Sequence, residues 1–327
     1  MTNASALTAL QSLAATNKSL ETTQARISTG YRVSTASDNA AYWSIATTMR
    51  SDKSSLSVVQ DALGLGAGKV DTAYSAITET IKTVNEIKDK LTAATGASAS
   101  DKAKIQTEIA TLQAQLKMGA DGATFSGANS LSVDTTTGHA TAGVHDNAKI
   151  VSAFTRSSAG AISLKTIDVD VQSVKLYEAF ATATEVQKGI IDGRRLATTG
   201  ARSNTATPVT GGAASAATDG YRVSDLTVIG YNDRQIGEML NVVDIAAKEL
   251  TDAATVLGAA KKRIDLQKSA TSALMDSIDR GVGQLVDADM NKESTRLQAL
   301  QVQQQLGIQA LSIANSNAQS IMSLFRS

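Results

Sequence analysis

The sequence predicts a mainly α-helical protein: a long antiparallel coiled-coil helix bundle formed by the N- and C-terminal segments, with a small central region that contains a β-hairpin. Three observations lead to this fold class. Apolar residues recur every seven positions in two segments that lie far apart in the chain, as they do in packed helix pairs. The last forty residues carry apolar residues at helical spacing and contain no Pro. The segment between the two heptad series is rich in Gly, Thr, Asp and Asn.

Two heptad series define the predicted bundle. The first indicates a helix of about 43 residues, roughly 65 Å long at 1.5 Å per residue, that ends at Gly96. The second indicates a helix from about Asp233 to Leu285. We expect the two helices to pack against each other, so that both termini lie on the same side. The first series is Leu56, Leu63, Val70, Ile77, Val84 and Leu91, and the second is Ile236, Val243, Leu250, Leu257 and Ile264.

The C-terminal stretch predicts a helix that is apolar on two faces. Asp289 is a candidate N-cap, and Glu293 lies in the first turn. A helix with apolar residues on opposite faces needs cover on both sides, either inside one monomer or from another copy of the protein. The position near a chain end favours the second. One face carries Leu297, Leu300, Ile308, Leu311, Met322 and Phe325, and the nearly opposite face carries Val302, Leu306, Ile313 and Leu324.

The N-terminal segment predicts a thinly apolar helix over residues 5–28, with Gly30 as its C-terminal cap. Such a helix is marginal alone in water, so we expect it to pair with the C-terminal helix. An irregular connector follows, before a new helix near Ala40 that contains Tyr42 and Trp43 as packing residues. The apolar positions of the first helix are Leu10, Leu13, Leu20 and Ile27.

The central region has a different character. Residues 100–117 predict a further helix, and residues 149–171 predict a β-hairpin around a Ser-Ser-Ala-Gly turn. A short helix is expected within 172–190 and a strand within 220–231. Residues 197–220 contain the only Pro of the chain and predict an exposed loop.

The composition excludes several classes of protein. Lys plus Arg and Asp plus Glu both number 31, so the chain has no basic surplus for nucleic acid or an anionic membrane. Cys is absent, which excludes a disulfide framework and a thiol site. The sequence has no run of 18 apolar residues, so we expect no membrane insertion. The N-terminus lacks the pattern of a cleaved secretory signal.

Three groups of residues resemble sites without meeting their requirements. The glycines of Gly64–Val70 lie mid-heptad and do not match a phosphate-binding loop, so we expect them to let two helices approach closely. His139 and His145 lie six residues apart in a polar loop, without the spacing of a zinc site. The third group consists of four carboxylates, which predict a solvated face or ion pairs between subunits: Asp276, Asp279, Asp287 and Asp289. The sequence therefore predicts no catalytic, metal or cofactor site.

Both ends of the chain resemble the bacterial flagellins. Residues 25–52, ARISTGYRVSTASDNAAYWSIATTMRSD, are similar to the N-terminal signature, in which a helix ends at S-[ST]-G-x-R-[IV] before A-x-D-[DN]-A-A. Residues 310–326, ALSIANSNAQSIMSLFR, are similar to the C-terminal ending of the family. Details of both ends resemble flagellins of rhizobia and other α-proteobacteria. The signature positions include Gly30, Arg32, Asp38, Asn39, Asn315 and Arg326.

The resemblance implies an extracellular structural subunit that polymerises into the hollow filament used for swimming. It implies terminal helices in an inner tube (1–39 with 288–327), a helical bundle with the hairpin in an outer tube (40–171 with 233–287), and a small surface segment (172–232). It implies type III export without a cleaved signal peptide. The alternative is a hook–filament junction protein, which shares the terminal pattern. An enzyme is not expected, because the central region lacks HExxH or a comparable motif.

The implied partners are further copies of the chain, alone or mixed with other flagellins, together with an export chaperone, the filament cap and hook-junction proteins. Flagellins sensed by Toll-like receptor 5 carry Q-R-V-R-E-L in the first outer-tube helix. The corresponding residues 82–87 are KTVNEI, with Thr83 and Asn85 in place of both arginines. We therefore expect little or no recognition by this receptor.

Overall fold

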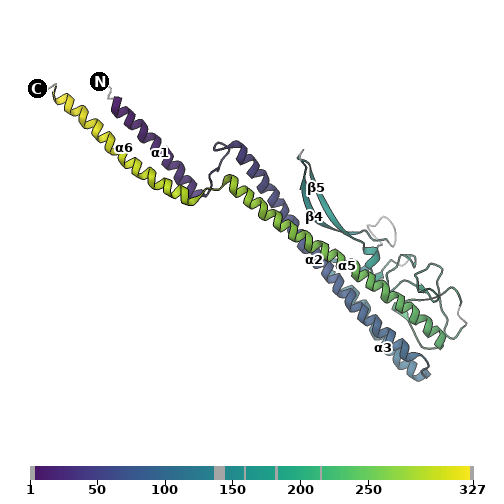
Figure 1. Ribbon diagram of the computed structural model, residues 1–327. Coiled ribbons are helices and arrows are strands. Elements are labelled where there is room, and N and C mark those ends of the chain that lie inside the picture. Colours follow the sequence, from purple (N-terminus) through teal and green to yellow (C-terminus); the bar gives the residue numbers. More distant parts are fainter. Residues whose placement is uncertain (1–3, 136–143, 158–159, 181–182, 214–215, 325–327) are drawn as a thin grey trace. The chain divides into compact units, whose positions relative to one another are not determined.

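The computed structural model describes residues 4–135, 144–157, 160–180, 183–213 and 216–324 (Figure 1). The chain forms two compact units, one made of Met1–Ser55 with Ala273–Ser327 and the other of Leu56–Ser272. We call them the terminal unit and the central unit. The mainly helical fold with a small β-containing middle is confirmed.

The terminal unit contains α1 (Ala4–Thr29), α6 (Met290–Leu324), the start of α2 (Ala40–Ala94) and the end of α5 (Asp233–Val286). α1 and α6 lie side by side and antiparallel (Figure 1). Gly30 ends α1 with φ of 75°, and its N–H donates to the Arg26 carbonyl at 2.8 Å. The Asp289 carboxylate accepts from the backbone N–H groups of Asn291 and Lys292 at 3.0 and 3.2 Å. Both predicted helix caps are therefore confirmed.

The central unit is built on α2, α5 and α3 (Ala99–Gly122), which starts at an N-cap on Ser98. α2 and α5 lie side by side, as the matching heptads predict (Figure 1). Every predicted heptad residue of both helices is buried. All of them except Leu56 join one apolar core, which holds the bundle together because burying each Leu, Ile or Val stabilises the folded state by about 1.5–3 kcal/mol.

The predicted hairpin is also confirmed, as β4 (Ala148–Arg156) paired antiparallel with β5 (Ile162–Val169). The register shifts between Val151 and Ala153. Its packing corrects the expected role of the glycines in α2. A Cβ on Gly66 would lie 2.3 Å from Ile150 of β4, and one on Gly68 would lie 2.7 Å from Phe125. These glycines admit a strand and an aromatic ring, where the sequence suggested a second helix.

Short elements complete the central unit. β1 (Thr124–Phe125) pairs with β2 (Ala128–Asn129), and β3 (Ser132–Val133) pairs in parallel with β6 (Tyr177–Glu178). A three-stranded sheet has the order β7-β9-β8, formed by Arg195–Leu196, Asp219–Tyr221 and Thr207–Pro208. The helix expected within 172–190 is only the single turn α4 (Val171–Val174). The strand expected within 220–231 is limited to β9, followed by a 3-10 turn at Val223–Asp225.

Residues 172–232 pack more deeply than their composition suggests. Leu176, Ile190 and Val228 are buried in the same apolar core as the heptad residues of α2 and α5. The guanidinium of Arg195 is fully buried and donates to both carboxylate oxygens of Glu249 on α5 at 2.8 Å. These residues of the segment 172–232 are therefore part of one core with the helices.

Candidate assembly surface

The contact between α1 and α6 contains very little apolar burial. Within the described parts of both helices, the buried side chains are Thr16, Thr23 and Glu293, and none is apolar. The Thr16 hydroxyl donates to the Ser12 carbonyl at 3.0 Å, so it is satisfied within its own helix. An isolated pair of helices without an apolar core has little to offset the entropy lost on ordering.

Polar contacts set the register of the pair. Arg26 donates to the Glu293 carboxylate at 3.2 Å, and the Gln304 amide donates to the Asn17 side-chain oxygen at 2.8 Å. Gly307 leaves room for Leu13, whose Cδ1 would lie 3.0 Å from a Cβ at that glycine. The half-buried Leu and Ile side chains in the described parts of α1 and α6 are Leu13, Leu20, Ile27, Leu297, Leu300 and Leu311.

Several large apolar residues in the described parts of the two helices are exposed. Val302, Leu306 and Ile313 on α6 are each more than half exposed, on the side expected from the sequence to lie opposite Leu297. Ile308 and Leu10 are also more than half exposed. The side chains of Met322 and Leu324, and the whole of Phe325, lie outside the described residues.

The signature residues between α1 and α2 build a backbone clamp. Arg32 donates its backbone N–H to the Val286 carbonyl at 2.6 Å and its guanidinium to the Leu285 carbonyl at 3.0 Å. Tyr31 forms an antiparallel bridge with Asp287. The connector is thereby tied to the segment between α5 and α6 within the terminal unit.

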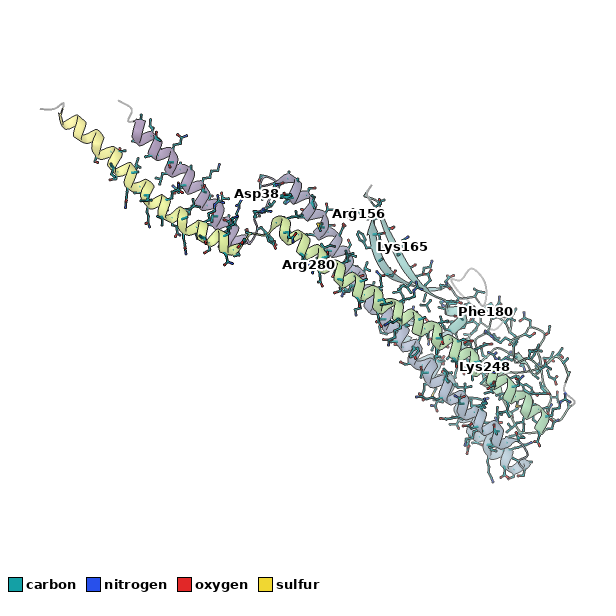
Figure 2. All side chains as sticks on the ribbon, in the orientation of Figure 1. Asp38, Arg156, Lys165, Phe180, Lys248 and Arg280 are labelled. Atoms are coloured by element: carbon teal, nitrogen blue, oxygen red, sulfur yellow. The ribbon has the colours of Figure 1, made fainter. Side chains whose placement is uncertain are left out.

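Asp38, which Figure 2 labels, and its neighbour Asn39 shape the same connector. The Asp38 carboxylate accepts from the backbone N–H groups of Thr35 at 2.9 Å and Ser34 at 3.0 Å, and these bonds lower the pKa of Asp38 below its usual value. Asn39 caps α2 by accepting from the Tyr42 N–H at 3.1 Å. Of the other signature positions, Asn315 is exposed on α6 and Arg326 lies outside the described residues.

Sequence reasoning missed the polar character of two contacts. The buried threonines of α1 follow the same seven-residue spacing as Leu13, Leu20 and Ile27, but a pattern search for apolar residues passes over them. Sequence reasoning also missed the buried ion pair between Lys175 and Glu178, at 2.9 Å. The Glu178 carboxylate accepts further hydrogen bonds from the backbone N–H groups of Thr135 and Phe180. Only the local spacing of opposite charges could have indicated that pair.

The glycine segment and the histidines that resemble binding sites in the sequence can now be placed in the structure. Gly64–Val70 lies inside α2. In the described part of the chain, no group of three His, Cys, Asp or Glu side chains could hold a metal ion. His145 Nδ1 lies 2.8 Å from the Asp146 carbonyl oxygen, and His139 is outside the described residues. No helix among the described residues is long and apolar enough to cross a membrane.

Comparison with known proteins finds matching family profiles and full-length relatives. The profile of the bacterial flagellin N-terminal helical region matches residues 1–136, and that of the C-terminal helical region matches residues 240–325. A flagellin of Brucella melitensis biotype 1 is 49% identical over 326 residues, covering 100% of this chain and 98% of the relative. Flagellin C of Rhizobium meliloti strain 1021 is 47% identical over 332 residues, again covering 100% and 98%.

A longer relative, flagellin A of Rhizobium meliloti strain 1021, is 42% identical over 397 aligned positions, which cover 100% of this chain and 99% of that protein. The matches thus run the full length of the chain and include the helices that carry the exposed apolar residues. The chain belongs to the bacterial flagellin family, whose members are the filament subunits of the bacterial flagellum.

Proposed function

We propose that the exposed apolar residues of α1 and α6 are the surface through which copies of this flagellin polymerise. One observation carries the proposal: the two helices bury no apolar side chain within their described parts, while Leu10, Val302, Leu306, Ile308 and Ile313 are each more than half exposed. Covering each of these side chains would contribute about 1.5–3 kcal/mol. A neighbouring subunit can supply that cover, and the monomer does not.

The heptad residues of α2 and α5 have a different role in this proposal. They are buried inside the central unit, so they stabilise the subunit before any contact with a neighbour. Residues 1–39 with 288–327 would then line the inner tube, and residues 40–171 with 233–287 would form the outer tube. The alternative of a hook–filament junction protein uses the same terminal surface but ends in a short ring.

Seeded elongation tests the proposal. Purified subunits are added to short filament fragments and followed by negative-stain microscopy. We expect filaments that elongate until the free subunit is exhausted. Growth that stops after a short ring of subunits has been added would favour the junction protein. Leu306→Ser should prevent elongation, because it places a polar side chain on the surface to be covered, while thermal unfolding of the central unit stays unchanged. Ser312→Ala, at another exposed position of α6, is the matched control.

By family resemblance, the accessory partners that we propose are an export chaperone, the filament cap and hook-junction proteins. We also propose that Toll-like receptor 5 does not respond to the monomer of this protein. Asn85 is exposed in place of an arginine, and Thr83, in place of the other, is buried. A reporter-cell assay with monomer should show little or no signal. A response at concentrations typical of enterobacterial flagellin would contradict this.

A further inference from the structure

Residues 172–232 are held to the helices although they contain little regular secondary structure. Their described parts form the end of the single turn α4, four strands of two or three residues, and one 3-10 turn. Helices and sheets satisfy their own backbone polar groups, whereas a buried irregular segment needs other partners for them. Charged side chains supply several of these partners here.

Carboxylates accept hydrogen bonds from backbone N–H groups within the segment. Asp192 accepts from the N–H groups of Gly189 at 2.7 Å and Glu178 at 3.0 Å. Glu185 accepts from the Arg194 N–H at 2.7 Å. These side chains do for the irregular backbone what ladder hydrogen bonds do in a sheet, so the positions of the charges fix the path of the chain.

Arginines donate to backbone carbonyl groups of the same segment. The Arg195 guanidinium donates to the carbonyls of Ile190 and Gly200, both at 3.0 Å. Arg202 donates to the Lys188 carbonyl at 2.6 Å. The planar guanidinium holds its donors in a fixed fork, so each arginine is compatible with only a narrow range of backbone positions.

One ion pair joins this charged framework to the helix bundle. The two Nη atoms of Arg195 donate to the two carboxylate oxygens of Glu249 on α5, each at 2.8 Å, and Arg202 lies 3.3 Å from the same carboxylate. The Arg195 side chain is 0% exposed, and its Nε has no hydrogen-bond partner among the described residues. Burying such a pair costs as much in desolvation as its attraction returns, so it is a weak source of net stability.

We propose that the Arg195–Glu249 pair selects one arrangement of residues 172–232 on α5 and contributes little net stability. Apolar burial is non-directional, so Leu176, Ile190 and the other core residues of the segment can be covered in shifted arrangements. The two parallel bonds to Glu249 form in only one of them. The subunits of a filament must be alike, and this pair gives every copy the same arrangement of the segment. The selection takes place within one subunit, so it does not depend on the proposed assembly surface of α1 and α6.

A distance measurement in the monomer tests this selection. The chain contains no Cys, so Val186→Cys and Leu266→Cys, both at exposed positions, carry the only two thiols for nitroxide labels. Double electron–electron resonance then measures how Val186 of the segment lies relative to Leu266 of α5. We expect one narrow distance with the ion pair intact. Arg195→Met combined with Glu249→Leu should give a second distance or a distribution about twice as wide, because an apolar core loses uniqueness before it loses stability.

Urea unfolding of the same variants separates selection from stabilisation. The double variant Arg195→Met/Glu249→Leu should unfold cooperatively, with a midpoint at or above that of the unaltered protein. Arg195→Lys keeps the charge but loses the fork, so it should also broaden the distance distribution. Lys90→Met with Glu108→Leu removes an ion pair between α2 and α3 whose side chains are 42% and 55% exposed, and this control should leave the distribution unchanged.

Two results would overturn the inference. A distribution in the Arg195→Met/Glu249→Leu variant that is as narrow as that of the unaltered pair would show that apolar packing alone fixes the segment. Loss of cooperative unfolding in that variant, or a clearly lower urea midpoint, would show that the pair stabilises the fold rather than selecting it. Neither result bears on seeded elongation, which tests the proposed function separately.

Discussion

At the scale of single residues, α2 offers a matched pair that separates buried from exposed leucines. Leu63 is 0% exposed in the core of the central unit, and Leu65, two positions on, is 64% exposed. Leu63→Ala should lower the free energy of unfolding by about 2–5 kcal/mol, because it leaves a cavity in a packed core. Leu65→Ala should change it by less than about 0.5 kcal/mol. Urea unfolding of the monomer measures both, and equal effects would contradict the described packing.

Two glycines of the same helix form a second matched pair. A Cβ on Gly66 would lie 2.3 Å from the Ile150 side chain, whereas a Cβ on Gly64 would meet nothing within 4 Å. Gly66→Ala should destabilise the central unit by about 1–3 kcal/mol through overpacking. Gly64→Ala should stabilise it by about 0.4–1 kcal/mol, because alanine favours the helix. Thermal unfolding of the two variants should therefore shift in opposite directions.

Asp244 provides a prediction about pH. It accepts from Lys88 at 2.6 Å and pairs with Lys248 at 2.8 Å, and the bonds from Lys248 and Lys88 lower the pKa of Asp244 to about 2 from its ordinary 3.8. A carboxyl group with a lowered pKa stabilises the folded state above its unfolded pKa. That contribution is lost as the pH falls from about 4 through the folded value near 2.

Asp244→Asn removes this pH-dependent contribution. The difference in unfolding free energy between the variant and the unaltered protein should be constant above pH about 4 and should shrink as the pH falls toward 2. The effect should be small, because both partners are more than a third exposed. Urea unfolding at several pH values checks it. A difference that stays constant through this range would show that Asp244 titrates normally.

At the scale of elements, residues 172–232 are expected to be required for a stable subunit. Leu176, Ile191 and Val223 are buried with the bundle, and Arg195 pairs with Glu249 of α5. Deleting the segment with a short Gly/Ser join should abolish cooperative unfolding, since it exposes the core and leaves Glu249 without this buried partner. Ile191→Ala is a milder test and should cost about 2–5 kcal/mol. Exposed Val186→Ala is the control, and normal filaments from the deletion variant would contradict the prediction.

The elements differ in how well the sequence predicts them. A strict heptad places Leu63 and Ile77 in the core because one side of each long helix always faces its partner. The hairpin follows from β-branched residues on both sides of a turn. The burial of Arg195 could not be predicted, because its partner Glu249 lies 54 residues away and only the tertiary fold brings them together.

The assembly surface also depends on contacts between residues that are far apart in the sequence. Two apolar faces on α6 can be recognised from spacing alone, but which face lies against α1 depends on contacts such as the pairs Arg26–Glu293 and Asn17–Gln304. The exposure of Trp43 also depends on how the connector folds back on Val286, which no local pattern specifies.

At the scale of the whole molecule, the two units differ in what stabilises them. The central unit has a continuous apolar core, whereas the described parts of α1 and α6 bury only threonines and a glutamate. Ordering each residue of a helix costs about 1–2 kcal/mol of backbone entropy, which hydrogen bonds and burial must offset. We therefore predict that the terminal helices are disordered in the monomer and fold when neighbouring subunits cover Val302, Leu306 and Ile313. This coupling would also prevent polymerisation before export.

Amide hydrogen exchange, measured on dilute monomer and on filaments, tests this coupling most directly. Residues 1–35 and 290–327 should exchange at near random-coil rates in the monomer and should be protected in the filament. The heptad helices of the central unit should be protected in both states and serve as the internal control. Strong protection of both terminal segments in dilute monomer would contradict the account, because it would show that α1 and α6 are stable without a neighbouring subunit.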